Sequence, residues 1–426
     1  MGIDAVALNT GTVASGDSSL AVGIGSLASG EASFAQGTCS VASAADAVAE
    51  GNYTSASGIA AHAEGSSNTS SGLTSHVEGY VSVASDTAAH AEGYHTRAAA
   101  YAAHAEGNTT LASGQSSHAE GVGTTASGSS SHAEGSSSIA SNYYAHAEGA
   151  VTVASGMYSH AQNYNTIAQN QAQTAIGKCN IESNPDLNNT PGDDAFIIGN
   201  GLSPIVRSNA FRIQFDGDVH SASGVYTTGA DYAEMFEWQD KNPTNEDRIG
   251  YFVTVQRGYI RKANDTDKYI LGVVSSAPSI VGDSQGCGWQ GMYLKDKWGR
   301  TLYEWADVQQ EILEAPEQPE GLADAPVVRK EAIEPSKLQR KSEMIRVYRP
   351  RLNPAYNSSL RYQPRTERGE WAAVGMMGKL RVRDDGSCQP DGLCKPNRDG
   401  IATASNEGYL VLKRIDTDIV LICLKG

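Results

Sequence analysis

Basic residues are nearly absent from the first half of this chain. Residues 1–200 contain only Arg97 and Lys178, against seventeen aspartates and glutamates, whereas the remaining 226 residues hold thirty basic and thirty-one acidic side chains. Because an acidic surface repels phosphate backbones, we expect no nucleic-acid binding by the first half.

The sequence also lacks long apolar runs and metal-type cysteine spacing. No segment has the length and apolarity of a membrane span or a secretory signal, so no membrane insertion is expected. The six cysteines form no Cys-x-x-Cys pair. Cys388 and Cys394 could bridge a short hairpin, but free thiols explain them at least as well. Because Met1-Gly2 runs straight into a repeat already in register, we expect a piece of a longer protein.

What is present is a fourteen-residue repeat. The tetrapeptide His-Ala-Glu-Gly or a close variant recurs at this interval, and in flanking turns an apolar residue takes the histidine position, as in Leu20-Ala-Val-Gly23 and Thr174-Ala-Ile-Gly177. Internal repetition of this kind outranks local propensity. The histidines are His62, His76, His90, His104, His118, His132, His146 and His160, and the glutamates are Glu64, Glu78, Glu92, Glu106, Glu120, Glu134 and Glu148.

A second row of large residues lies seven positions before each histidine position. Alanine follows most of them, and Ser-Gly or Ser-Asn pairs such as Ser113-Gly114 and Ser141-Asn142 mark corners where glycine and asparagine tolerate a left-handed backbone. Two short strands in fourteen residues leave no room for a helix, which predicts a left-handed parallel β-roll over residues 1–200. The row is Val13, Leu27, Val41, Val83, Leu111, Ile139, Val153 and Ile167.

Strand alternation separates small from large side chains. Ala119 and Gly121 share one face, which suits a narrow interior, while His118 and Glu120 point the other way. The Val/Leu/Ile row is too apolar to lie in water, so we expect it to pack against sister chains in a homotrimer.

The histidine and glutamate positions allow two interpretations. Imidazole and carboxylate are good zinc ligands. However, coils repeat at about 4.8 Å, whereas a structural site needs ligands that converge on one ion. The sequence therefore favours histidine–glutamate hydrogen bonds, with no metal and no cofactor, and it predicts a thermal stability that changes between pH 7.5 and pH 5.

The composition changes after residue 200. A strand and a small-residue linker occupy 201–230, and a mostly-β domain is expected over 231–426, with an insertion or arm at 296–370. That arm has helical potential around Leu302–Leu313. The complete fold class is thus an all-β-dominated chain with one partly helical excursion.

Both halves resemble known families. The repeat is similar to the head β-rolls of trimeric autotransporter adhesins, on the strings quoted above. The C-terminal half resembles the auto-processing intramolecular chaperone domain at the ends of phage tail spikes and pre-neck appendages. Its matching strings are Ala230–Trp238, Asn242–Val253, Ile270–Val274 with Gly282-Asp283, and Gly400–Ala402 with Gly408-Tyr409.

The second resemblance implies self-cleavage. Such a domain trimerises its fibre and then cuts its own chain, as a single-turnover endopeptidase that depends on acidic residues. Asp231 and Glu234 match the family's acidic pair, and the cut is expected around Thr227-Thr228. One carboxyl group kept protonated by burial could act as the acid and the other as the base. Either water or the Thr228 hydroxyl could be the nucleophile. The alternative is that Asp231 and Glu234 only cap a strand end.

These features predict a virion tail spike or appendage. Its expected partners are other copies of the same chain in a homotrimer and a receptor or glycan on the host surface. The alternative is a bacterial surface adhesin with the same roll and a non-cleaving trimerisation domain. A glycan-degrading enzyme lacks support because the carboxylates of the roll are periodic, and periodic residues are usually structural.

Overall fold

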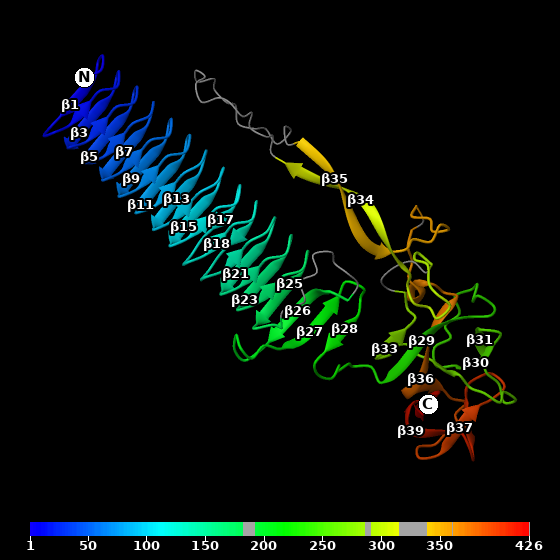
Figure 1. Ribbon diagram of the computed structural model, residues 1–426. Coiled ribbons are helices and arrows are strands. Elements are labelled where there is room, and N and C mark those ends of the chain that lie inside the picture. Colours follow the sequence, from blue (N-terminus) through cyan, green and yellow to red (C-terminus); the bar gives the residue numbers. More distant parts are fainter. Residues whose placement is uncertain (182–191, 286–290, 315–338, 360, 426) are drawn as a thin grey trace. The chain divides into compact units, whose positions relative to one another are not determined.

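The computed structural model describes residues 1–181, 192–285, 291–314, 339–359 and 361–425. The chain divides into two compact units. The first comprises residues 1–224 with 305–349, and the second comprises 225–304 with 350–426. Figure 1 labels strands of both units.

The first unit is a parallel β-solenoid with two sheets. Each strand pairs with the strand fourteen residues further on, so that His118 faces His132 and Ala119 faces Ala133. This confirms the predicted period and the two strands per coil. One sheet contains β1 (Val6–Leu8), β3 (Leu20–Ile24), β5 (Phe34–Thr38), β7 (Val48–Asn52), β9 (His62–Ser66), β11 (His76–Tyr80), β13 (His90–Tyr94), β15 (His104–Asn108), β17 (His118–Ala119), β19 (His132–Ala133), β21 (His146–Ala150), β23 (His160–Tyr164) and β25 (Thr174–Lys178).

The other sheet carries the Val/Leu/Ile row on two-residue strands. They are β2 (Val13–Ala14), β4 (Leu27–Ala28), β6 (Val41–Ala42), β8 (Ser55–Ala56), β10 (Thr69–Ser70), β12 (Val83–Ala84), β14 (Arg97–Ala98), β16 (Leu111–Ala112), β18 (Thr125–Ala126), β20 (Ile139–Ala140), β22 (Val153–Ala154) and β24 (Ile167–Ala168). The first sheet continues through β26 (Asp194–Asn200), which is parallel to β25, and then through the antiparallel β27 (Asn209–Gln214) and β28 (Val219–Ser221).

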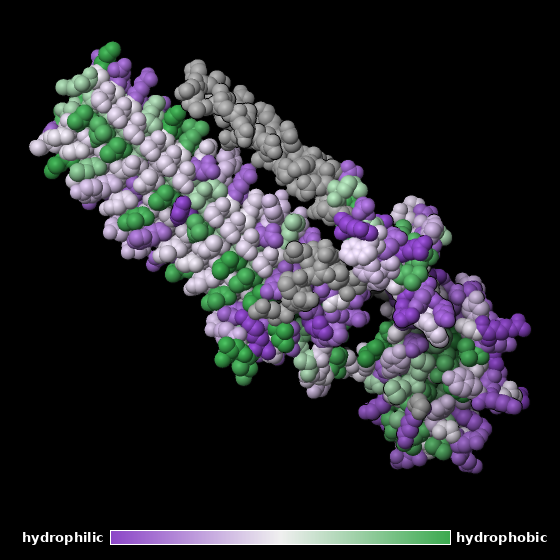
Figure 2. All heavy atoms as spheres, in the orientation of Figure 1, coloured by the Kyte–Doolittle hydropathy of each residue, from purple (hydrophilic) through white to green (hydrophobic). Residues whose placement is uncertain are grey.

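The interior of the roll is built from alanine and small hydroxyl residues. Ala119 and Ala126 are fully buried, and so are the alanines at the equivalent positions of most coils. Buried serines and threonines bond along the stack, for example Thr152 Oγ1 to Ser138 Oγ at 2.9 Å and Ser138 Oγ to the Gly149 carbonyl at 3.2 Å. Large side chains stay outside, where hydrophobic ones are scattered between polar ones on the face shown in Figure 2.

The left-handed backbone at the corners does not lie on the glycine and asparagine residues of the Ser-Gly and Ser-Asn pairs, contrary to the prediction from the sequence. Left-handed backbone falls on non-glycine residues such as Ser116 (φ 53°) and Tyr144 (φ 57°), two positions after Gly114 and Asn142. Gly114 is required by crowding instead, because a Cβ there would lie 1.9 Å from the carbonyl oxygen of Gly128 in the next coil. Gly121 does not line the interior; it is half-exposed and has a φ of 101°.

The predicted helix around Leu302–Leu313 is wrong. This segment lies in β34 (Tyr303–Glu314), which pairs with β35 (Gln339–Pro350) in a two-stranded sheet. The Trp305 and Tyr348 rings lie 5.1 Å apart between the two strands. Local propensity cannot register such a partner, because strand formation depends on cross-strand packing.

The second unit is a ten-stranded sheet that curls around two apolar clusters. Phe252, Val273 and Val382 belong to one, and Trp238 and Ile260 to the other. Its strands are β29 (Asp231–Glu237), β30 (Phe252–Gln256), β31 (Tyr259–Lys262), β32 (Gly272–Val274), β33 (Ile280–Gly282), β36 (Trp371–Arg383), β37 (Leu393–Pro396), β38 (Ala402–Ser405), β39 (Tyr409–Asp416) and β40 (Ile419–Leu424).

The described ranges contain very little helix, and their cysteines are free thiols. A 3-10 turn, η2 (Arg365–Glu367), is the one helical segment among the described residues, and no helix in them is long and apolar enough to cross a membrane. Cys388 and Cys394 are buried free thiols, not a bridge. Burial raises the pKa of the Cys394 thiol to about 11, which keeps it protonated.

Candidate functional site

Strand β29 positions both acidic residues of the expected site. It lies between β33, to which it is parallel, and the antiparallel β36. Alternation along β29 buries Asp231, Ala233 and Met235 on one face and leaves Tyr232 and Glu234 half-buried on the other. The sheet therefore fixes which carboxylate enters the core.

Asp231 is a buried carboxyl group at the first position of this strand. Only 6% of the residue is exposed, and its Oδ2 atom has no hydrogen-bond partner among the described residues. Burial raises the pKa of Asp231, and a hydrogen bond with the Ser275 side chain offsets part of that shift. Gly375 leaves the space for this group, because a Cβ at that position would lie 2.6 Å from Oδ2.

Glu234 has a different environment. The Tyr232 hydroxyl donates a hydrogen bond to Glu234 Oε1 at 2.7 Å, on the face of β29 opposite to Asp231. A Cβ at Gly282 of β33 would lie 3.0 Å from both Glu234 Cγ and the Tyr232 hydroxyl oxygen. Within one chain, the structure therefore does not bring the two predicted catalytic carboxylates together.

The predicted cleavage region is an exposed segment that ends at the buried strand. Thr227 and Thr228 are exposed and outside any strand, and the preceding Tyr226 is 93% exposed. Two residues later the chain is held closely: the Ala230 carbonyl accepts a hydrogen bond from Lys379 N at 3.0 Å. An accessible peptide bond thus precedes a fixed carboxyl group by only a few residues.

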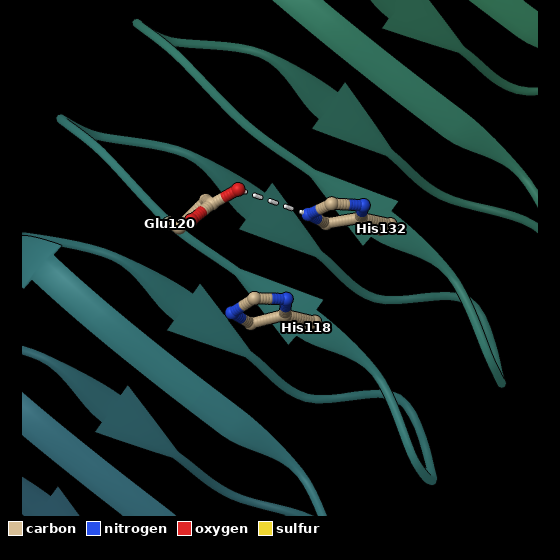
Figure 3. Close-up of side chains that lie close together, drawn as sticks. All are labelled: His118, Glu120 and His132. Atoms are coloured by element: carbon tan, nitrogen blue, oxygen red, sulfur yellow. Dashed lines mark ion pairs between the residues drawn. The ribbon is translucent and has the colours of Figure 1, made fainter.

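The His–Glu ladder is the second group of predicted residues, and we use this name for the eight stacked histidines with the glutamates of the same sheet. Neighbouring imidazole rings lie 4.7 to 4.9 Å apart. The nearest carboxylate to His132 Nε2 is Glu120 of the preceding coil, at 3.4 Å (Figure 3). Desolvation by burial, and then the neighbouring His118, lower the pKa of His132, so its imidazole is neutral near pH 7.

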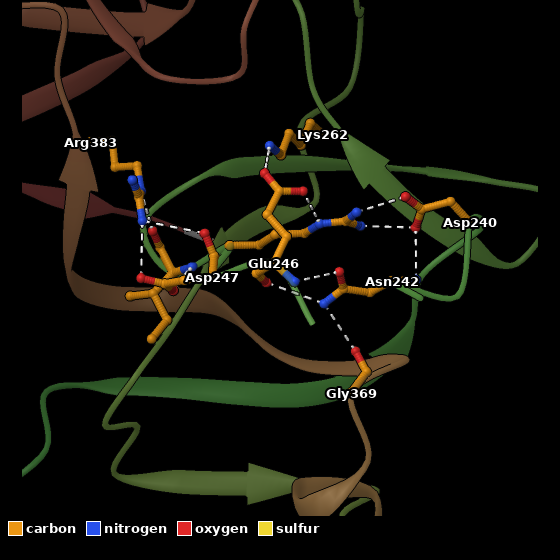
Figure 4. Close-up of polar contacts among 9 residues, drawn as sticks. Asp240, Asn242, Glu246, Asp247, Lys262, Gly369 and Arg383 are labelled. Atoms are coloured by element: carbon orange, nitrogen blue, oxygen red, sulfur yellow. Dashed lines mark hydrogen bonds and ion pairs between the residues drawn. The ribbon is translucent and has the colours of Figure 1, made fainter. Parts of the chain in front are cut away.

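The sequence did not predict a cluster of ion pairs formed by residues that follow β29 in the chain. Arg248 binds both carboxylate oxygens of Asp240, at 2.8 and 2.7 Å, and its Nε binds Glu246 at 2.8 Å. The Arg248 guanidinium also stacks over Trp238, 4.5 Å from the ring centre. Hydrogen bonding from Arg248 lowers the pKa of Asp240 to about 2. Figure 4 labels Asp240 and Glu246 of this cluster and shows Lys262 on Glu246. Glu246 and Arg248 lie within the Asn242–Val253 string and Asp240 lies two residues before it, but their pairing depends on the fold.

Residues 188–420 match the family described as Peptidase_G2, IMC autoproteolytic cleavage domain. The match spans more than half of the chain and includes both carboxylates of β29 and the exposed segment before them. The chain belongs to this family. The match covers the second unit as far as residue 420, together with residues 188–224 and 305–349 of the first unit, and it confirms the expected C-terminal resemblance.

Curated relatives of this chain include appendage proteins of Bacillus phages. The chain is 28% identical over 222 residues to the pre-neck appendage protein of phage B103, covering 52% of this chain and 20% of that protein. It is 29% identical over 191 residues to the preneck appendage protein of phage PZA, covering 45% and 18%. The chain thus spans about a fifth of the length of these relatives.

Among solved structures, the pre-mature bacteriophage phi29 gene product 12 is 18% identical, with a TM-score of 0.42. It covers 95% of this chain, and this chain covers 39% of it.

Proposed function

We propose that this chain is part of a phage appendage whose C-terminal domain trimerises the fibre and then cuts its own chain next to Thr227-Thr228. The observation that carries the proposal is Asp231: a buried carboxyl with an unpartnered oxygen, placed just after an exposed segment in a domain of an autoproteolytic family. The appendage names of its phage relatives support a virion location.

The proposed chemistry starts from the burial of Asp231 just after the exposed segment, and this burial also raises the pKa of the carboxyl group. Water or the Thr228 hydroxyl attacks the Thr227 carbonyl carbon, and the C–N bond to Thr228 breaks as the protonated Asp231 donates to the departing nitrogen. With Thr228 as nucleophile, the ester formed by the acyl shift is hydrolysed by water. Glu234 lies on the other face of β29 from Asp231. If Glu234 is the base, it would take the proton from the nucleophile at the cleavage site of a neighbouring chain. Cleavage would then require trimer formation.

Denaturing electrophoresis of freshly folded protein tests the cut. We expect fragments of residues 1–227 and 228–426 from the unchanged chain and one intact band from Asp231→Asn. Asp218→Asn is the matched control, because this exposed aspartate lies before the cut and should leave cleavage unchanged. An Asp231→Asn trimer with native circular dichroism that still cleaves would overturn the role of Asp231.

The variant Glu234→Gln distinguishes a role of Glu234 as the catalytic base from a structural role as the hydrogen-bond partner of Tyr232. If Glu234 is the base, the variant forms trimers that do not cleave, whereas a role limited to holding Tyr232 leaves cleavage intact. Mixing the uncut Asp231→Asn and Glu234→Gln chains before refolding should restore some cleavage only when the two carboxylates act from different chains.

The trimer itself rests on the Val/Leu/Ile row of the second sheet. Val13 is 49% exposed and Ile139 is 39% exposed in the isolated chain, so the row presents apolar area that a sister chain would cover. We expect Leu111→Asp with Ile139→Asp to reduce the trimer fraction in light scattering. Ser113→Asp, on an exposed corner, is the control. A wild-type chain that is monomeric at all concentrations would contradict this assembly.

The roll also offers an aromatic surface for a host receptor or glycan. Tyr80 and Tyr94 stack at 5.4 Å and are about half-exposed, and Tyr144 and Tyr158 stack at 5.2 Å. Such flat, rigid and partly polar rings suit binding surfaces. Tyr80→Ala with Tyr94→Ala should reduce binding to host cells several-fold, whereas unchanged binding would remove this pair from the receptor surface.

A further inference from the structure

Seven of the eight histidines in the His–Glu ladder have a buried Nε2 atom without a hydrogen-bond partner among the described residues. The sequence favoured hydrogen-bonded histidine–glutamate pairs, and a weak 3.4 Å contact between His62 and Glu50 is the one such bond found among the described residues of the ladder. A buried nitrogen without a partner is costly and rare in folded proteins. The buried Nε2 atoms without a partner are those of His76, His90, His104, His118, His132, His146 and His160.

The distances between these nitrogens and the neighbouring carboxylates suit a shared ion. Nε2 lies 3.4 Å from the nearest carboxylate oxygen at His118–Glu106, His132–Glu120 and His146–Glu134. A charge-assisted hydrogen bond would be about 2.7–2.9 Å. Two ligands that each lie about 2.0–2.1 Å from a tetrahedral zinc ion are about 3.3–3.4 Å apart. The spacing therefore matches two ligands of one ion better than a direct bond.

The surroundings of the ladder also suit a cation. The ligand atoms of His118, Glu120 and His132 all lie within 4.8 Å of one another, and equivalent groups recur along the sheet. An open groove runs beside them and is lined by Glu64, Glu78, Glu92 and Glu106 with their following glycines. Arg97 lies in the other sheet and cannot neutralise this row.

We propose that the His–Glu ladder is a linear binding site for zinc-class divalent ions, each held by one histidine Nε2 and the carboxylate of the preceding coil. Water completes the coordination. The imidazole planes of His104 and His118 are parallel, so their nitrogens cannot both aim at a single ion, and each histidine serves its own. Two such ions in adjacent coils repel each other, so alternate coils fill first.

Ligand chemistry decides which ions bind. Imidazole nitrogen selects zinc, cobalt and nickel over calcium and magnesium, which prefer oxygen alone. Bound ions would fasten coil to coil along the outside of the roll, because each one joins residues of two successive turns. They would therefore raise the melting temperature of the roll through mass action.

The test is metal binding by the full chain, produced without a polyhistidine tag. Equilibrium dialysis against Zn²⁺ should give more than one ion per chain, and Co²⁺ should give the strong visible absorption of tetrahedral cobalt. Replacing Glu106, Glu120 and Glu134 by glutamine removes three of the six cross-coil pairs and should abolish roughly half of the zinc bound at saturation, when adjacent coils are also filled.

A matched control removes the same charge elsewhere on the roll. Asp17→Asn with Glu31→Gln and Asp46→Asn changes three exposed acidic residues outside the ladder and should leave zinc binding unchanged. Glu120→Gln alone provides a milder variant, and native circular dichroism in EDTA confirms folding. Fewer than one zinc per chain, equal loss in both triple variants, or equal competition by Ca²⁺ would overturn the site.

Discussion

The roll and the C-terminal domain reach a buried core by opposite means. In the described part of the roll nearly every core side chain is alanine, serine or threonine, and Val77 and Ile197 are the larger aliphatic side chains buried in the alanine row. In the C-terminal domain the buried side chains include Trp238, Phe252 and Ile260. The roll thus depends on backbone stacking between successive coils, whereas the C-terminal domain depends on non-local packing of large side chains.

That difference predicts where each region tolerates change. A solenoid gains stability from neighbour-to-neighbour contacts, so a defect acts on one coil and its two neighbours. In the C-terminal domain each apolar cluster is built from segments that are distant in sequence, so a cavity in a cluster weakens contacts between many strands. Charge follows the same division: the roll keeps glutamates in a row, and the C-terminal domain pairs them with arginines such as Arg248.

The largest expected effect is Phe252→Ala. Phe252 is fully buried and stacks on Tyr409 at 5.5 Å, so its truncation should cost about 3–5 kcal/mol of C-terminal unfolding free energy. Every tryptophan of the chain lies at position 238 or later, so tryptophan fluorescence during urea unfolding reports on the part outside the roll. Phe252→Leu should cost much less, and equal losses for both variants would contradict a packing origin.

A smaller, local effect is expected for Gly114→Ala in the roll. The new Cβ would press on the Gly128 carbonyl oxygen, so adjacent coils must separate, at a cost of about 1–3 kcal/mol. Gly123→Ala is the control. Its φ of 65° resembles that of Ser137 in the next coil, and its Cβ would find only Ser137 Oγ at 3.6 Å. Far-ultraviolet circular dichroism follows the roll, and an equal loss in both variants would exclude the proposed crowding.

The smallest expected effect is that of pH on the stability of the roll. Burial, followed by neighbouring histidines, lowers the pKa of His76, His104 and His146 below the ordinary 6.5. The unfolded chain then binds protons more readily, so the stability of the roll is complete above about pH 6.5 and falls as the pH drops below it. Differential scanning calorimetry in EDTA should show a lower melting temperature for the roll at pH 5 than at pH 7.5.

The C-terminal domain provides an internal reference for that scan. The pKa of Asp240 is lowered to about 2, below its ordinary 3.8, so its contribution is present above about pH 4 and is lost only toward pH 2. A C-terminal transition that falls as far as that of the roll between pH 7.5 and pH 5 would contradict the assignment to the ladder.

The sequence alone determined the roll, because a strict fourteen-residue period leaves few ways to stack identical coils. It also placed Asp231 and Thr227-Thr228 in one short stretch, since neighbours in sequence remain neighbours in space. Only the tertiary structure showed that Asp231–Glu237 is a strand paired on both edges, because strand pairing is a non-local property; alternation along that strand then places Asp231 and Glu234 on opposite faces. It likewise replaced the expected helix around Leu302–Leu313 by the paired strand β34, and it showed that seven Nε2 atoms of the ladder lack the hydrogen bonds that the spacing had suggested.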